Sequence, residues 1–157
     1  MAVRNSTAWT PTLMAAFSVL LTASLAEASF SVVDFTSCGG DVLQVRVDPC
    51  EKLPCSFKKG RSAKIEMDFH SVYNQSSVSV GIMGKSHGVL LPLPFNQKDG
   101  CTSSGLDCPL QAGRNYTVAR AVKVYRIYPK MEILAVFQVS GKGGDVLACV
   151  EFPIHIM

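Results

Sequence analysis

The stretch Ala63–His70, AKIEMDFH, alternates apolar and polar residues at every position. Its odd-numbered residues are apolar, and its even-numbered residues are Lys, Glu, Asp and His. Successive side chains of a β-strand point to opposite faces of the sheet. The pattern therefore predicts a strand with one buried face and one hydrated face.

The same alternation recurs in four other segments of the chain. Their predicted buried faces consist of Leu43, Val45 and Val47; of Val78, Val80 and Ile82; of the odd-numbered residues from Met131 to Val139; and of the even-numbered residues from Val146 to Ile156. Clusters rich in Gly, Asn, Ser and Asp separate these segments, as is typical of turns. Several short alternating strands at this spacing predict an all-β protein, either a sandwich or a barrel.

Length and composition narrow the class of protein. The chain has 157 residues, a length typical of one domain. Hydrophobic residues make up 48% and charged residues only 17%, which excludes an intrinsically disordered chain. The net charge is +3 without a dense run of Lys and Arg, so no nucleic-acid partner is expected. No apolar run reaches about 18 residues, so no membrane-spanning helix is expected.

Residues 1–28 have the features of a secretory signal peptide. Arg4 supplies the positive charge, residues 13–21 form a short apolar core, and the sequence AEA at 26–28 fits the small-x-small cleavage rule. We therefore predict a signal peptide at 1–28 and a single mature domain at 29–157. In a secreted chain, two sequons predict N-glycosylation at Asn74 and Asn115.

Secretion gives the cysteines a structural meaning, because disulfides form in oxidising compartments. The six cysteines are Cys38, Cys50, Cys55, Cys101, Cys108 and Cys149. The second and third are close in sequence, as are the fourth and fifth, and either pair would close a small loop. Spacing alone does not select among the possible pairings. No Cys-x-x-Cys motif occurs and the histidines are scattered, so no metal site is predicted.

The sequence contains none of the familiar catalytic motifs. His-Glu-x-x-His, Gly-x-Ser-x-Gly and a phosphate-binding glycine loop are all missing from the sequence. His70, His87 and His155 lie in three separate segments, and the first and last fall on the hydrated faces of their predicted strands. We therefore expect a protein that is not an enzyme and needs no cofactor. A Ser–His pair assembled by folding, as in a hydrolase of lipid esters, is the alternative from a different class.

The predicted inward faces are apolar with few polar interruptions, which suits either a solid core or the lining of a cavity. The segment Gly88–Phe95, GVLLPLPF, is apolar yet contains two prolines, so it is predicted to be an edge strand or an irregular loop. Its side chains then either cap the core or line the mouth of a pocket. A second segment is similar, because Val122, Val124 and Tyr128 share one parity and a proline ends the run.

Short motifs around the cysteines resemble the ML (lipid-recognition) domain family. They are Asp34–Gly39 (DFTSCG), Asp48–Cys50 with Pro54-Cys55, Asp99–Cys101, Leu106–Leu110 (LDCPL), Tyr116, Val124 with Tyr128-Pro129, and Leu147–Cys149. The resemblance runs from about Phe30 to Ile156. Within the family the chain is most similar to the soluble sterol carriers, and it is also similar to the mite group 2 allergens.

This resemblance implies an immunoglobulin-like two-sheet β-sandwich with an apolar cavity between the sheets. It implies the disulfides Cys38–Cys149, Cys50–Cys55 and Cys101–Cys108. It also implies lipid contacts at Leu93, Val124, Tyr128, Phe137 and Val150, to which the proline-containing segment adds Phe95. Because Leu93 and Val150 stand where the sterol carriers have aromatic residues, the pocket is expected to stay apolar but to change shape.

The sequence therefore predicts a secreted or lysosomal protein that binds a sterol such as cholesterol. It would act as a monomer and transfer the sterol between membranes, or to a membrane-bound acceptor, without covalent chemistry. One alternative is the binding of fatty acids, phospholipids or microbial lipids in chemical sensing or innate immunity. Another is a structural protein with a solid core, which would show no cavity.

Overall fold

The alternating stretch Ala63–His70 forms most of the strand β4 (Ser62–Ser71), which lies between two partner strands. The computed structural model describes residues 29–93 and 98–157. The predicted signal peptide at 1–28 and the predicted lipid contact Phe95 lie outside the described residues. The other elements are β1 (Ser31–Val32), β2 (Thr36–Asp48), β3 (Cys55–Phe57), β5 (Val78–Ser86), β6 (Val89–Pro92), β7 (Lys98–Asp99), α1 (Gly100–Ser103), β8 (Arg114–Lys123), β9 (Met131–Gly141) and β10 (Val146–Ile156).

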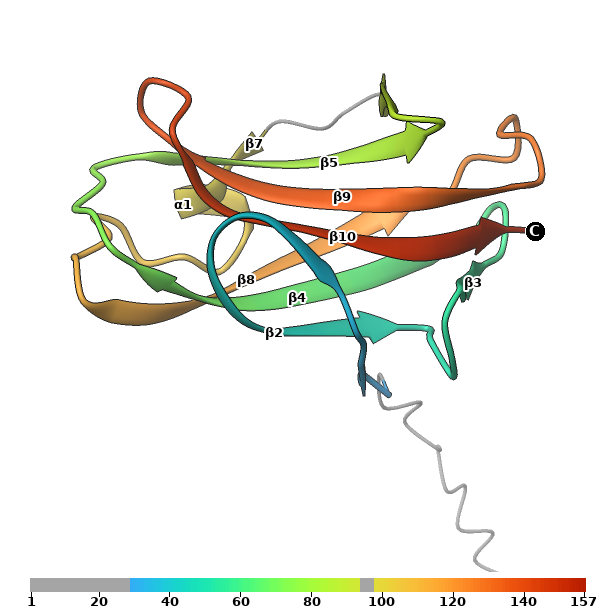
Figure 1. Ribbon diagram of the computed structural model, residues 1–157, viewed down its shortest axis with the longest axis horizontal. Helices are drawn as coiled ribbons and strands as arrows, with labels where there is room; N and C mark the ends of the chain where they lie inside the picture. The colour runs from blue at the N-terminus through green and yellow to red at the C-terminus, as the bar shows by residue number, and fades with distance from the viewer. Residues whose placement is uncertain (1–28, 94–97) are drawn as a thin grey trace, which may run out of the picture.

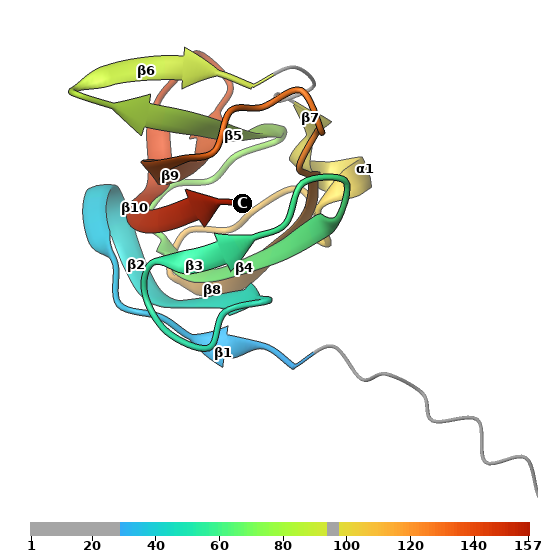
Figure 2. The same cartoon turned by 90° about the vertical axis from the view of Figure 1, so that its right-hand side faces the viewer.

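The long strands form two layers that face each other (Figures 1 and 2). One layer has the order β6-β5-β9-β10, and the other has the order β2-β4-β8. Neighbours along both layers are antiparallel, whereas the short β3 pairs in parallel with the end of β10. The predicted all-β, two-sheet sandwich is confirmed. No helix within the described ranges has the length and hydrophobicity of a membrane span.

Strand β2 belongs to both layers, so the two sheets are joined along one side. Its first part, Thr36–Gly40, pairs with β10, and its second part, Asp41–Asp48, pairs with β4. The strand turns from one sheet to the other at Gly40, which has a φ of +74°. A Cβ atom at this position would overlap the backbone carbonyl oxygen of Leu147. Glycine is therefore required here by both conformation and space.

The alternating patterns place most of the predicted apolar faces correctly. The inward residues of β4, β5 and β9 are buried or nearly so, and Phe69, Val80 and Phe137 are completely buried. Leu43 is an exception, because a register shift between Val42 and Gln44 turns it outward and leaves it 50% exposed. Val146 is also 41% exposed, because the register of β10 shifts between this residue and Ala148.

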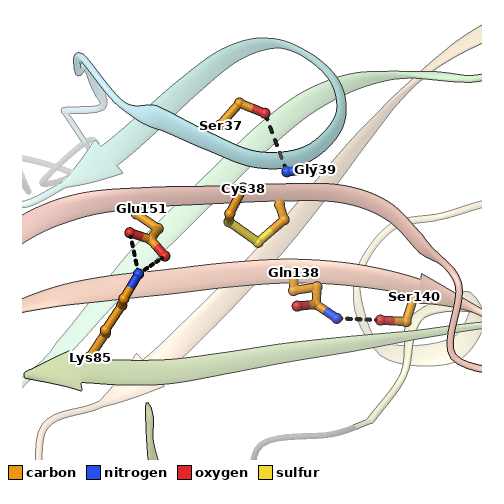
Figure 3. Close-up of a disulfide and its surroundings, with 8 residues drawn as sticks. Ser37, Cys38, Gly39, Lys85, Gln138, Ser140 and Glu151 are labelled. Carbon is orange, nitrogen blue, oxygen red and sulfur yellow. Dashed lines mark hydrogen bonds and ion pairs between the residues drawn. A yellow bond between two sulfur atoms is a disulfide. The ribbon is translucent and has the colours of Figure 1, made fainter. Parts of the chain in front are cut away.

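The structure contains the three disulfides that the resemblance implies: Cys38–Cys149, Cys50–Cys55 and Cys101–Cys108. The first joins β2 to β10 across a sequence separation of 111 residues, and Figure 3 shows it in the layer that also contains β5. In the same layer, Lys85 Nζ lies 2.8 Å from Glu151 Oε1, which links β5 to β10 across the intervening β9 (Figure 3). Both links hold this sheet together from its outer side.

The outer face of the opposite sheet carries a compact ion-pair network. Arg46 on β2 donates from Nε to Glu66 Oε2 at 3.0 Å and from Nη1 to Asp68 Oδ2 at 2.6 Å. Asp68 also accepts a hydrogen bond from the Thr117 hydroxyl on β8, at 2.7 Å. The hydrogen bonds from Arg46 hold the pKa of Asp68 below its usual range and raise that of the guanidinium. The network thus crosses the three strands on their hydrated face.

Candidate ligand-binding cavity

An apolar cavity of about 30 Å³ lies between the two layers, and its lining includes Ile154 and Ile156 at the end of β10. The C-terminus that follows β10 faces the viewer in Figure 2. The cavity walls come from both sheets and from the segments that follow β6 and β8. The lining residues are Phe57, Ile65, Ile82, Met83, Gly84, Leu93, Val122, Lys123, Val124, Tyr128, Ile133, Ala135, Ile154 and Ile156. Lys123 is the one residue in this set with a charged side chain, and Tyr128 adds a phenolic hydroxyl.

Strand alternation explains most of the cavity wall. Ile65, Ile133 and Ile154 each lie on the inward face of their strand, where the alternating pattern predicts an apolar residue. Phe57 ends the short β3 and is 4% exposed. Because these side chains approach from β3, β4, β9 and β10, the cavity is enclosed by residues that are far apart in the sequence.

The loop after β8 closes the mouth and is held by backbone hydrogen bonds. The Gly60 N–H donates to the Val124 carbonyl oxygen at 2.6 Å, and the Val124 N–H donates to the Arg61 carbonyl oxygen at 2.9 Å. Lys59 Nζ donates to the carbonyl oxygen of Tyr128 at 3.1 Å. The turn between β3 and β4 therefore fixes the position of this loop.

Tyr128 is half-buried at the mouth. Its ring makes an edge-to-face contact with Tyr125, with the ring centroids 5.7 Å apart. Burial, with a smaller contribution from Tyr125, raises the pKa of the Tyr128 hydroxyl above its ordinary value. Burial thus disfavours the ionised form of this hydroxyl.

The structure brings together Leu93, Val124 and Tyr128, three of the residues predicted to contact lipid. Phe137 and Val150 are completely buried and form a cross-strand pair between β9 and β10, but they do not line this cavity. Neither alternation nor the family resemblance assigns the isoleucines of the wall to the site. Alternation marked most of them as inward-facing, but it does not show how far along the sandwich an inward residue lies.

The cavity is much smaller than a ligand site. Pockets for small organic molecules typically measure about 300 Å³ or more, whereas this cavity holds about 30 Å³. The family resemblance implies a pocket that takes a sterol, whereas in this structure the side chains close most of the space. Apolar side chains pack densely because an unfilled gap loses dispersion contacts. A sterol or fatty chain would fit only if the walls moved apart.

The polar groups considered as catalytic residues lie elsewhere. His70 Nδ1 lies 2.8 Å from Asn115 Oδ1 on the outer face. Ser86 Oγ lies 3.0 Å from His87 Nδ1 at the exposed start of the turn between β5 and β6, and neither residue lines the cavity. In the part of the chain that the structure describes, no three His, Cys, Asp or Glu residues are grouped as a metal site would require.

Apolar side chains are exposed on both segments that border the mouth. In the edge strand β6, Val89 is 61% exposed and Leu90 is 50% exposed. In the loop after β8, Ile127 is 87% exposed, and it directly precedes Tyr128. The segment with two prolines thus begins as an edge strand, as predicted, and its apolar residues face outward as well as inward.

The chain matches the family model described as the ML domain over residues 32–156. It is 32% identical over 148 residues to NPC intracellular cholesterol transporter 2 of Canis lupus familiaris, covering 92% of this chain and 97% of that protein. It is 25% identical over 132 residues to the mite group 2 allergen Lep d 2 of Lepidoglyphus destructor, covering 83% of this chain and 92% of the allergen.

Solved structures show the same fold. A Niemann-Pick type C2 protein from Japanese carpenter ant matches with a TM-score of 0.73 at 20% identity, covering 80% of this chain and all of that one. Chicken MD-1 complexed with lipid IVa matches with a TM-score of 0.53 at 13% identity, covering 82% of this chain and 98% of that one. Together with the sequence matches, these likenesses confirm the resemblance to ML domains.

Proposed function

Because the chain belongs to the ML domain family, we propose that it is a secreted or lysosomal lipid-binding protein that takes a sterol into the cavity between its sheets. The observation that carries the proposal is the lining of this cavity, whose described residues are apolar apart from Lys123 and the Tyr128 hydroxyl. Similarity to a protein named as a cholesterol transporter supports a sterol such as cholesterol as the first ligand to test.

Burial of the ligand supplies the free energy that opens the cavity. A ligand that buries about 400 Å² of apolar surface gains on the order of 10 kcal/mol before ordering costs, at about 25 cal/mol per Å². This gain offsets the cost of displacing wall residues. The parts of the wall outside the strand ladders are Leu93, which follows the edge strand β6, and the loop from Val124 to Tyr128. We propose that these two segments move outward when a lipid enters.

Release of the lipid would take place at a membrane surface or at a membrane-bound acceptor. Val89 and Leu90 on β6, and Ile127 beside the mouth, expose apolar surface next to the segments that would open. Such side chains can enter the interfacial region of a bilayer. The net charge of +3 would favour an anionic membrane. We propose that this end of the sandwich faces the membrane during transfer.

Binding of a fluorescent sterol such as dehydroergosterol to the purified protein tests the proposal. We expect saturable binding with micromolar or better affinity, competed by unlabelled cholesterol. Mass spectrometry of lipid extracted from protein purified from its natural source then shows whether the bound species is a sterol, a fatty acid or a phospholipid. Absence of saturable binding to sterols would remove the sterol as ligand, and absence of binding to all three lipid classes would remove the lipid-binding function itself.

A further inference from the structure

A second hollow, about 310 Å³ in volume, lies on the surface beside the apolar cavity. We call it the basic groove. It is built from the loop closed by the Cys50–Cys55 disulfide, from the turn between β3 and β4, and from Val124. The lining residues are Pro49, Cys50, Glu51, Lys52, Pro54, Ser56, Phe57, Lys58, Arg61, Ser62, Ala63 and Val124.

The basic groove and the apolar cavity share two wall residues. Phe57 and Val124 line both spaces, and both are almost completely buried, at 4% and 5% exposure. These two residues therefore form a partition that borders the polar hollow on one side and the apolar cavity on the other. A molecule with a polar end and an apolar end would occupy both spaces if the partition shifted.

Most of the charged side chains that line the groove are positive. Lys52, Lys58 and Arg61 are exposed and line the groove, and among the described lining residues Glu51 supplies the one carboxylate. Elsewhere in the described chain, ion pairs join Arg46 and Lys85 to carboxylates, but none joins these three cations to one. Their side chains also make no hydrogen bond within the described residues, so all three are available to an incoming anion.

We propose that the basic groove binds the anionic headgroup, a phosphate or a carboxylate, of a lipid whose apolar chain enters the cavity. This inference rests on the proposed lipid-binding function and adds anionic amphiphiles to the uncharged sterols as a ligand class of the same cavity. Lys and Arg donate charge-assisted hydrogen bonds to phosphate and carboxylate oxygens. The disulfide holds the loop that carries Lys52, so this wall of the groove is formed before the ligand arrives.

Two lipids that differ only in the headgroup charge test the proposal. Equilibrium dialysis would compare 1-oleoyl lysophosphatidic acid with 1-oleoylglycerol, which has the same chain and no phosphate. We expect the anionic lipid to bind at least about tenfold more tightly, the effect of a single charge-assisted hydrogen bond. In the triple variant K52Q/K58Q/R61Q this preference should disappear, while the affinity for 1-oleoylglycerol should stay within about twofold of wild type, because the apolar contacts are unchanged.

A matched control removes the same charges elsewhere. Lys64, Arg114 and Lys142 are exposed and line neither space, so K64Q/R114Q/K142Q should retain the preference. Equal affinity of the wild type for the two lipids, or equal loss of preference in both triple variants, would overturn the headgroup site and leave the proposed function standing. Displacement of the anionic lipid by equimolar glycerol 3-phosphate would also overturn it, because the groove would then take soluble phosphates. Failure of both lipids and of sterols to bind would remove the proposed function itself.

Discussion

Lys59 Nζ lies 3.1 Å from the backbone carbonyl oxygen of Tyr128, so a side chain from the turn between β3 and β4 holds the loop at the cavity mouth. The two residues are 69 positions apart in the sequence. Because the carbonyl belongs to the segment proposed to move, this hydrogen bond opposes opening. Its strength should therefore set the rate at which lipid enters and leaves.

Replacing Lys59 with Met removes this hydrogen bond and keeps most of the side-chain volume. We expect lipid release to accelerate several-fold, since hydrogen bonds to charged groups stabilise by about 1.5–3 kcal/mol when buried and less here at the surface. Stopped-flow transfer of a fluorescent sterol to vesicles measures the rate. Lys130→Met, in the same loop, is the control. Equal rates in the wild type and in Lys59→Met would contradict this role.

Enlarging a wall residue should block the cavity. Val122 on β8 is half-buried and lines the cavity, whereas its neighbour Ala121 faces outward. We expect Val122→Phe to lower sterol affinity by about five- to a hundredfold, because overpacking costs about 1–3 kcal/mol and the ring fills space that the ligand needs. Ala121→Phe should leave affinity unchanged. Fluorescent sterol titration provides both values, and similar losses in the two variants would show that the effect is not local to the cavity.

The exposed side chain of Ile127 should matter for transfer and not for binding. Ile127→Ser removes apolar surface that would otherwise enter the membrane, so we expect transfer to anionic vesicles to slow by about tenfold. Val72, which is 54% exposed in the turn between β4 and β5, provides the control Val72→Ser. Sterol affinity in solution should be unchanged in both variants. A transfer rate that stays at the wild-type value in Ile127→Ser would exclude this contact.

Gly40 should be among the least replaceable residues of the fold. Gly40→Ala combines a positive φ with overlap between the new Cβ and the Leu147 carbonyl oxygen, so we expect it to destabilise the protein by more than about 3 kcal/mol. Gly113 also has a positive φ, of +82°, but lies in open space. Gly113→Ala should therefore lower the free energy of unfolding by only about 1–2 kcal/mol, which is the cost of a positive φ for a residue with a Cβ atom. Urea denaturation of the two variants separates steric overlap from backbone strain.

The Arg46–Asp68 ion pair should make the free energy of unfolding depend on pH in the acid range. Hydrogen bonds from Arg46 lower the pKa of Asp68 below its ordinary value of 3.8. Asp68 thus binds a proton less readily in the folded protein than in the unfolded chain. The ion pair therefore adds to the free energy of unfolding above pH 3.8, and this stabilisation is lost as the pH falls through the pKa of Asp68 in the folded protein. Urea midpoints between pH 5 and pH 2 should fall less steeply in Asp68→Asn than in the wild type. At pH 7 the variant should be less stable by about 1 kcal/mol. If the urea midpoints of the wild type and of Asp68→Asn fell equally steeply with pH, Asp68 would not be the source of this pH dependence.

The sequence predicted the strands well where alternation is regular. In Ala63–His70 every odd-numbered residue is buried, as expected. Leu43 shows the limit of this argument, because a register shift in a strand depends on the partner strand and leaves no mark in the alternation itself. The same holds at Val146.

The site was predictable in part. The resemblance drew attention to Leu93, Val124 and Tyr128, which meet at the cavity. The basic groove was not foreseen, because it depends on the contact of Val124 with the turn at Gly60 and Arg61, more than 60 residues earlier in the chain. The size of the cavity also depends on side-chain packing, which the pattern of apolar residues does not specify.

Strand β2 belongs to both sheets, and the Cys38–Cys149 disulfide lies along the same side of the sandwich. This side therefore acts as a fixed hinge, and the sheets cannot separate there without breaking strand pairing. The opposite side is bordered by the edge strands β6 and β8, which share no strand pairing with each other. When the interior expands, the sheets must therefore move apart at the β6–β8 side and stay together at the β2 side. A guest molecule would enter and depart along the β6–β8 margin with the hinge intact.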